Sequence, residues 1–257
     1  MTNSQLPLDR RDWIAGLEKG LHIIEAFDAA HTRLTATEMA ERCGMTRTAA
    51  RRYLKTLTYL GYVGTDGKLY WLTPRILRLG HAYIESARLP RLVQPFLQRI
   101  ASGTEEIAYL GVLDGDDVVF IARSGLQRHT ASGYMPGTRM PTQVTAAGMI
   151  MLAFGDESEM DKWLNAHDLR SFTSFTVADK GALRESLIGF KRQGWALSEQ
   201  QLELNFRGIA VPLLDRKNRV HGAISMTVPM NREETDHALN RLLPVLQEAA
   251  RSLRPLL

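Results

Sequence analysis

The sequence has few of the residues that form disulfide bonds or bind structural metal ions. It has one cysteine, Cys43, among 257 residues, which excludes an internal disulfide and a cysteine-based zinc site. No apolar run is long enough to cross a bilayer. The opening MTNSQLPLDRRDW also lacks the apolar core of a secretory signal peptide. These absences favour a cytoplasmic protein with no membrane partner.

The sequence also lacks the motifs of common enzyme sites. Its seven histidines show no metal-ligand spacing, and there is no Gly-x-Ser-x-Gly elbow and no Gly-Lys-Ser/Thr phosphate loop. His221 and Ser225 share one face of a predicted strand, but they are too far apart, since a base must lie within about 3 Å of its nucleophile. We therefore predict no catalytic residue, no metal site and no cofactor.

Charge is distributed unevenly along the chain, whose formal net charge is +4. Residues 1–88 contain 13 Lys and Arg against 9 Asp and Glu, whereas residues 89–257 contain 19 of each. From Arg42 to Thr65 there are five basic residues and no acidic one. Such a local patch suits a polyanion partner. A solvated helix face is the simpler alternative.

The first third of the chain predicts two helices before this patch. Residues 13–28 carry apolar residues at helical spacing. Thr35 and Glu38 have the spacing of a capping box, which starts a short second helix. Gly44 then suits the left-handed end of that helix. A tight turn after Gly44 is therefore expected.

A third helix and a hairpin follow this turn. Thr46 is positioned to cap a helix that runs to about Leu60. Residues 62–72 have β-type residues on both sides of an Asp-Gly pair, a strong hairpin signal. The order of helix, short helix, turn, helix and hairpin predicts a winged helix-turn-helix over residues 1–73.

The two sides of the third helix predict different roles. Leu54, Leu57 and Leu60 are expected to pack on the first two helices, which leaves the basic side outward to enter a DNA major groove. Arginine suits both guanine edges and phosphates, and the lysines suit backbone contacts. The candidate DNA-binding residues are Thr46, Arg47, Thr48, Arg51, Arg52, Lys55 and Lys68.

The rest of the chain predicts a linker and a second domain. Residues 74–90 read as an amphipathic linker helix. Residues 91–257 mix predicted helices with predicted strands, which favours an α+β domain of the sensor type. The helices are expected near 91–101, 145–154, 156–166, 179–192 and 231–255, and the strands near 106–113, 116–123, 126–133, 195–198, 207–214 and 220–228.

Two stretches predict a pocket for a small polar ligand. In 220–228, strand periodicity puts Ser225 and Thr227 on a small hydroxylated face with His221 and Ala223; a solvent-facing strand side is the alternative. The opposite, core face holds Val220, Gly222, Ile224, Met226 and Val228.

The second stretch begins a predicted helix with Thr145, Ala146 and Ala147. Free backbone N–H groups at a helix start attract carboxylates, and the Arg139 guanidinium just upstream would suit an organic anion. The alternative is that Gly137, Pro141 and Gly148 only shape a loop and a close helix contact.

Taken together, these stretches resemble the IclR-type transcriptional regulators over essentially the whole chain. The similarity is carried first by WIAGLEKGLHIIEAF, TATEMAERCGMTRTAARRYLKTLTYLGYV and LRLG, and then by GTRMPTQVTAAG, RGIAVPLLD and GAISMTVP. DWIAGLEKGL and the GTRMP loop are most similar to the branch that controls aromatic-acid catabolism, such as protocatechuate and 4-hydroxybenzoate regulators. The resemblance implies a GAF-like effector domain and a dimer or dimer of dimers on a palindromic operator, with RNA polymerase as a further candidate partner.

The resemblance also implies effector contacts at particular positions. In the founding branch, which binds small keto acids, an acidic residue stands at the place of Ser198 and a cysteine at the place of Gly208. Both are smaller here, which would admit a benzoate ring lined by Tyr109, Tyr134 and Met149. The resemblance maps effector contacts onto Ala146, Ala147, Ser198, Gly208, Ser225 and Thr227. Together with Arg139 and Thr145 from the helix-start argument above, these are the candidate effector-binding residues.

The sequence thus predicts a DNA-binding transcriptional regulator controlled by a small organic acid, with an aromatic carboxylate favoured. A repressor that responds to a small aliphatic keto acid is the alternative, and activation and repression are both open. A purely architectural DNA-binding protein is disfavoured, because bending DNA does not require so long a C-terminal domain.

Overall fold

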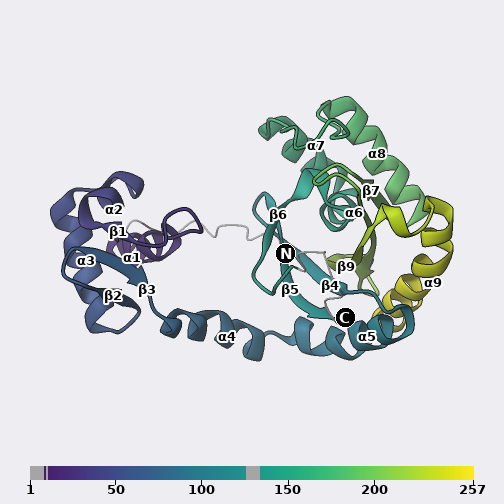
Figure 1. Cartoon of the computed structure of the whole chain (residues 1–257). Helices are drawn as coiled ribbons and strands as arrows, with labels where there is room; N and C mark the ends of the chain where they lie inside the picture. The colour runs from purple at the N-terminus through teal and green to yellow at the C-terminus, as the bar shows by residue number, and fades with distance from the viewer. Residues whose placement is uncertain (1–8, 10, 126–133) are drawn as a thin grey trace. The chain divides into compact units, whose positions relative to one another are not determined.

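The structure is a computed structural model that describes residue 9 and residues 11–125 and 134–257. The chain divides into two compact units, one ending at Ser86 and the other beginning at Ala87 (Figure 1). The α+β class, with a helix-turn-helix unit followed by a sheet unit, is confirmed. The strand expected at 126–133 lies outside the described residues. Among those described, no helix is long and apolar enough to span a membrane.

In the part that the structure describes, the first unit combines four α-helices with a small antiparallel sheet of order β1-β3-β2. The strand β1 was not predicted, because its two residues have no periodicity of their own and form a strand only by pairing with β3. The elements are α1 (Ala15–Glu25), β1 (Leu34–Thr35), α2 (Ala36–Arg42), α3 (Arg47–Tyr59), β2 (Val63–Thr65) and β3 (Leu69–Leu72), followed by a 3-10 turn (Pro74–Ile76) and α4 (Leu77–Ser86).

Local side chains set the turn between α2 and α3. The capping box is formed: the Glu38 backbone N–H donates to the Thr35 hydroxyl over 3.3 Å, and the Glu38 carboxylate accepts from the Thr35 N–H over 2.7 Å. Gly44 has φ +60, where glycine is favoured. The Thr46 hydroxyl then accepts from the Ala49 N–H at 3.2 Å, so α3 starts where the sequence predicted.

The core of this unit differs from the predicted pattern at two places. Of α1, only Ile23 is buried, whereas Leu17 and Leu21 of the expected apolar stripe are 61% and 45% exposed. In α3, Leu54 and Leu57 are buried as expected, but Leu60 is 45% exposed. Leu60 lies at the C-cap, where the chain already turns away from the helix.

Within the described residues, the second unit contains a six-stranded antiparallel sheet of order β6-β5-β4-β9-β8-β7. The helices α5 and α9 cover one face, and α6, backed by α7 and α8, covers the other (Figure 1). The elements are α5 (Arg88–Thr104), β4 (Ala108–Asp114), β5 (Asp117–Ser124), β6 (Arg139–Pro141), a 3-10 turn (Thr142–Val144), α6 (Ala146–Phe154), α7 (Glu157–Ala166), α8 (Lys180–Gln193), β7 (Ala196–Glu199), β8 (Phe206–Leu214), β9 (Val220–Pro229), a 3-10 turn (Met230–Arg232) and α9 (Thr235–Leu253).

Two boundaries differ from the sequence-based expectation. The linker helix was expected to reach Pro90, but α4 ends at Ser86 and α5 already contains Pro90 in its first turn. Proline is tolerated there because first-turn N–H groups have no intrahelical acceptor. The strand β6 was expected to be a loop, since it forms through main-chain pairing with β5 rather than through side-chain alternation.

The alternation predicted for β9 holds over most of the strand. Ile224, Met226 and Val228 enter the core beneath α5 and α9, whereas Ala223 faces α6. Val220 is an exception, because it packs on the α6 side. The cause is a shift in the β8–β9 register between Leu213 and Leu214. This shift turns the Val220 side chain to the opposite face of the sheet from the one that simple alternation predicts.

A glycine allows α6 to lie directly on the 3-10 turn that precedes it. A Cβ atom at Gly148 would stand 2.4 Å from the carbonyl oxygen of Thr142 and 2.7 Å from its Cα. These neighbours are backbone atoms, which cannot move away without shifting the start of α6. The close helix contact that the sequence suggested as the alternative role of Gly148 is therefore present in the structure.

We expect Gly148→Ala to lower the free energy of unfolding by about 1–3 kcal/mol, because it overpacks a backbone contact. The matched control is Gly189→Ala in α8, where a Cβ would meet nothing within 4 Å. That change should be neutral or stabilise by up to about 1 kcal/mol, as alanine has the higher helix propensity. Urea unfolding followed by circular dichroism measures both; equal effects would contradict the packing argument.

Candidate functional sites

The outward side of α3 carries four cations. Arg47, Arg51, Arg52 and Lys55 are all exposed, while Ala50, Leu54 and Leu57 on the other side are buried. Within the described residues, no side-chain hydrogen bond or ion pair engages any of the four cations. The helix therefore offers unneutralised positive charge to solvent, as the DNA-binding prediction requires.

Other arginines of the same unit are bound within the chain. Arg42 donates to the Asp28 carboxylate at 2.8 Å and to the carbonyl oxygen of Ala26 at 3.1 Å. Arg75 donates to the carbonyl oxygen of Leu60, and Arg33 lies 4.4 Å above the Trp71 ring. The structure thus separates structural arginines from the α3 cations, a distinction that residue type alone does not make.

The remaining candidate DNA-binding residues lie near the ends of α3 and in the wing. Thr48 is exposed in the first turn, and the Thr46 hydroxyl is committed to capping the helix. Lys68 is exposed in the β2–β3 turn. The Asp66 carboxylate shapes that turn by accepting from the Leu69 and Lys68 N–H groups, and these bonds lower its pKa.

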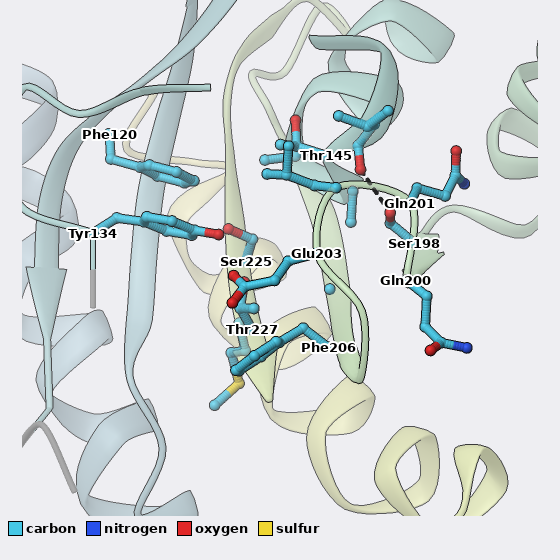
Figure 2. Close-up of a pocket in the computed structure, with 16 residues that line it drawn as sticks. Phe120, Tyr134, Thr145, Ser198, Gln200, Gln201, Glu203, Phe206, Ser225 and Thr227 are labelled. Carbon is cyan, nitrogen blue, oxygen red and sulfur yellow. Dashed lines mark hydrogen bonds between the residues drawn. The ribbon is translucent and has the colours of Figure 1, made fainter. Parts of the chain in front are cut away.

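A pocket in the second unit opens between the start of α6, the β7–β8 loop and β9 (Figure 2). Its empty volume is about 460 Å³, including space open to solvent. Seven of the eight candidate effector residues line it, namely Thr145, Ala146, Ala147, Ser198, Gly208, Ser225 and Thr227. Segments far apart in the sequence therefore meet at one cavity. That these residues contact an effector stays a prediction.

Arg139 is the candidate that the structure does not bring to this pocket. Its guanidinium pairs with Asp114 at 2.6 Å and Asp117 at 3.0 Å, and the hydrogen bond that it donates to Asp114 is the main cause of its raised pKa. Pairing of β6 with β5 places Arg139 beside these carboxylates of the β4–β5 hairpin. The expectation that Arg139 faces an organic anion at α6 is therefore corrected.

The α6 end of the pocket is rich in hydrogen-bond donors. The Thr145 hydroxyl accepts from the Gly148 N–H at 3.2 Å. In the described part of the chain, no hydrogen bond is present at the N–H groups of Ala146 and Ala147, and both residues are nearly fully buried. The Ser198 hydroxyl, in contrast, is committed to the carbonyl oxygen of Val144 at 2.6 Å. The helix dipole makes this end suitable for an anion.

An aromatic wall forms another side of the pocket. The rings of Phe120 and Tyr134 are stacked, with centroids 5.1 Å apart and planes 2° apart. Burial raises the pKa of Tyr134 to about 12, and the charge of Glu203 adds to the rise, so the phenol stays neutral. Tyr109 packs behind both rings rather than lining the cavity. Met149, the third residue expected in the slot, points instead into the α7–α8 core.

The β7–β8 loop supplies lining residues that sequence reasoning missed. Gln200, Gln201 and Glu203 of the loop border the cavity, as does Phe206 at the start of β8 (Figure 2). The loop has no periodicity, and two of its residues, Gln200 and Asn205, have positive φ. Only its position between two sheet strands indicates that its side chains reach the pocket, so no local signal was available.

Comparisons with known proteins match both parts of the chain to one family. Residues 16–67 match the IclR helix-turn-helix domain, and residues 81–254 match the family described as bacterial transcriptional regulator IclR C-terminal. The Pca operon regulatory protein of Acinetobacter baylyi is 37% identical, covering 100% of this chain and 93% of its own length. The p-hydroxybenzoate hydroxylase transcriptional activator of the same organism is also 37% identical, covering 95% and 92%.

A solved structure resembles the second unit in particular. It is a double mutant of the PobR transcription factor inducer-binding domain from Acinetobacter, in complex with 3-hydroxybenzoic acid. It is 30% identical, with a TM-score of 0.63, and the match covers 66% of this chain and 100% of that one.

Proposed function

The chain belongs to the IclR family of bacterial transcriptional regulators, and we propose that an aromatic carboxylate, bound in the α6 pocket, controls its action on DNA. It is a DNA-binding regulator and not an enzyme. One observation carries the effector proposal: the unused N–H groups of Ala146 and Ala147 share a cavity with the stacked rings of Phe120 and Tyr134. A carboxylate and a ring would each find a partner there.

The relatives support the same ligand class. One is named for its control of p-hydroxybenzoate hydroxylase, and another was solved with 3-hydroxybenzoic acid. A small aliphatic keto acid, the alternative ligand, would leave the aromatic wall without a contact. The relative's description as an activator also favours activation for this chain.

Control of DNA binding requires the effector to bind two states of the protein with different affinity. We assign residues 1–73 to a DNA-binding domain, 74–90 to a linker and 91–257 to the effector-binding domain. The linker is the covalent connection through which the effector state would reach α3. We propose a palindromic operator and a cytoplasmic location, with RNA polymerase as a further partner.

The effector proposal is tested by calorimetry of the full chain against hydroxybenzoates, benzoate, glyoxylate and pyruvate. Aromatic acids should bind and the two keto acids should not, because only the former fill the space beside Phe120 and Tyr134. Arg139→Ala should leave the affinity unchanged, since that guanidinium is held by Asp114 and Asp117. Binding of pyruvate without any aromatic acid would overturn the ligand class.

We expect Arg51→Ala or Arg52→Ala to weaken operator binding by about 1–3 kcal/mol if the residue reads a base. The duplex is first selected from a random pool by the unaltered protein, and gel shifts at fixed salt then give the affinities. Arg78→Ala on α4 is the control, because it removes another exposed positive charge from the same unit. If both α3 variants bind like the unaltered protein, α3 is not the recognition helix.

Self-association is supported by the outer face of α1. Ile14, Leu17 and Leu21 are 69%, 61% and 45% exposed, and helical spacing puts them on one stripe. An uncovered stripe of this kind favours burial against another chain. We propose that α1 contributes to a dimer or tetramer of this protein.

Light scattering after size-exclusion chromatography tests this role of α1. We expect Leu17→Asp to lower the average molar mass, since it places a charge in the proposed contact. Lys19→Asp changes an exposed residue of the same helix and should leave the mass unchanged. An unaltered protein that runs as a monomer at all concentrations would refute the assembly.

A further inference from the structure

Glu203 places an acid at a pocket proposed to bind an acid. It is exposed on the β7–β8 loop and lines the cavity. Among the residues that the structure describes, the lining contains no Lys, Arg or His. Among described residues it has no hydrogen bond or ion pair. Figure 2 shows its carboxylate directed toward the side of the pocket where Tyr134, Ser225 and Thr227 lie. The charge of Glu203 also contributes to the raised pKa of the Tyr134 hydroxyl, after burial.

The position of this charge gives the pocket two unlike ends. The start of α6 offers donors and a positive dipole end, whereas Glu203 offers only acceptors when ionised. An anionic ligand would therefore direct its carboxylate to Ala146 and Ala147 and away from Glu203, because like charges repel. The far edge of its ring would then face Glu203.

A ring edge without polar groups would be a poor partner for this carboxylate. It would remove water from Glu203 and return no hydrogen bond, which is costly for a charged group. A hydroxyl or amino group on the ring would replace the lost water with a charge-assisted bond. A second carboxylate on the ring would be repelled.

We propose, on the basis of the proposed function, that Glu203 is a specificity-determining residue. It selects aromatic acids that carry a hydrogen-bond donor on the ring, because its carboxylate accepts a hydrogen bond from that donor. The class comprises hydroxybenzoates and aminobenzoates. Benzoate itself, fluorobenzoates and benzenedicarboxylates are disfavoured.

The test is calorimetry of the full-length protein with matched ligands. The donor set is 3- and 4-hydroxybenzoate and 3- and 4-aminobenzoate, and the set without a donor is benzoate and 3- and 4-fluorobenzoate. For at least one ring position, donor ligands should bind the unaltered protein about 10- to 100-fold more tightly, the range expected for a hydrogen bond to a charged group.

Substitution at Glu203 should remove the discrimination rather than the binding. In Glu203→Ala the ratio of donor-ligand affinity to matched non-donor affinity should fall to about one. Benzoate should bind as tightly as before or more tightly, because the repulsion by Glu203 and the desolvation of its carboxylate are gone. Glu203→Gln should give an intermediate ratio, since a neutral amide oxygen is a weaker acceptor. A merely structural residue would weaken all ligands together. Glu185→Gln, at an exposed position of α8, is the control and should leave the ratio unchanged.

The possible failures are distinguishable. If the unaltered protein binds none of these acids, the proposed effector class is wrong, and this inference with it. If it binds them but the ratio is the same with and without the Glu203 carboxylate, the pocket assignment stands and the role of Glu203 is refuted. Melting curves of each variant check folding independently of ligand.

Discussion

The close contact between α6 and the turn before it is the constraint on which the pocket depends. Gly148 has no side chain, so α6 can start directly against Thr142. This contact places the first N–H groups of the helix opposite β8 and β9, where Gly208 and Ser225 are small enough to leave space. A larger side chain at Gly148 would move the whole donor end of the cavity.

The pocket combines three kinds of chemistry that no single element supplies. The start of α6 contributes donors, β5 and the segment before β6 contribute stacked rings, and the β7–β8 loop contributes an acid. Because these groups differ in charge and polarity, a ligand can satisfy all of them in only a few orientations. Selectivity of such a site comes from the arrangement of unlike partners more than from the volume enclosed.

The DNA-binding unit achieves its charge asymmetry by a different route. Its basic residues are alike in type, but the fold engages some of them in hydrogen bonds within the chain. Arg42 is held by Asp28, and Arg75 by the end of α3, whereas the cations of α3 have no partner among the described residues. Four cations without a described partner therefore lie together on one side of α3. A concentrated charge attracts a polyanion more strongly than the same charge spread over the surface.

Local chemistry was predictable from the sequence by itself. The capping box at Thr35, the cap at Thr46, the helix-turn-helix order and most strand faces follow from neighbours within a few residues, and so they appear as predicted. Tertiary structure alone decided which distant groups meet. Arg139 pairs with the β4–β5 hairpin, Met149 packs in the α7–α8 core, and Glu203 lines the pocket. The physical reason is that strand pairing and helix packing bring together residues that are far apart in the sequence. The residues next to a side chain along the chain therefore do not indicate which distant residues it will contact.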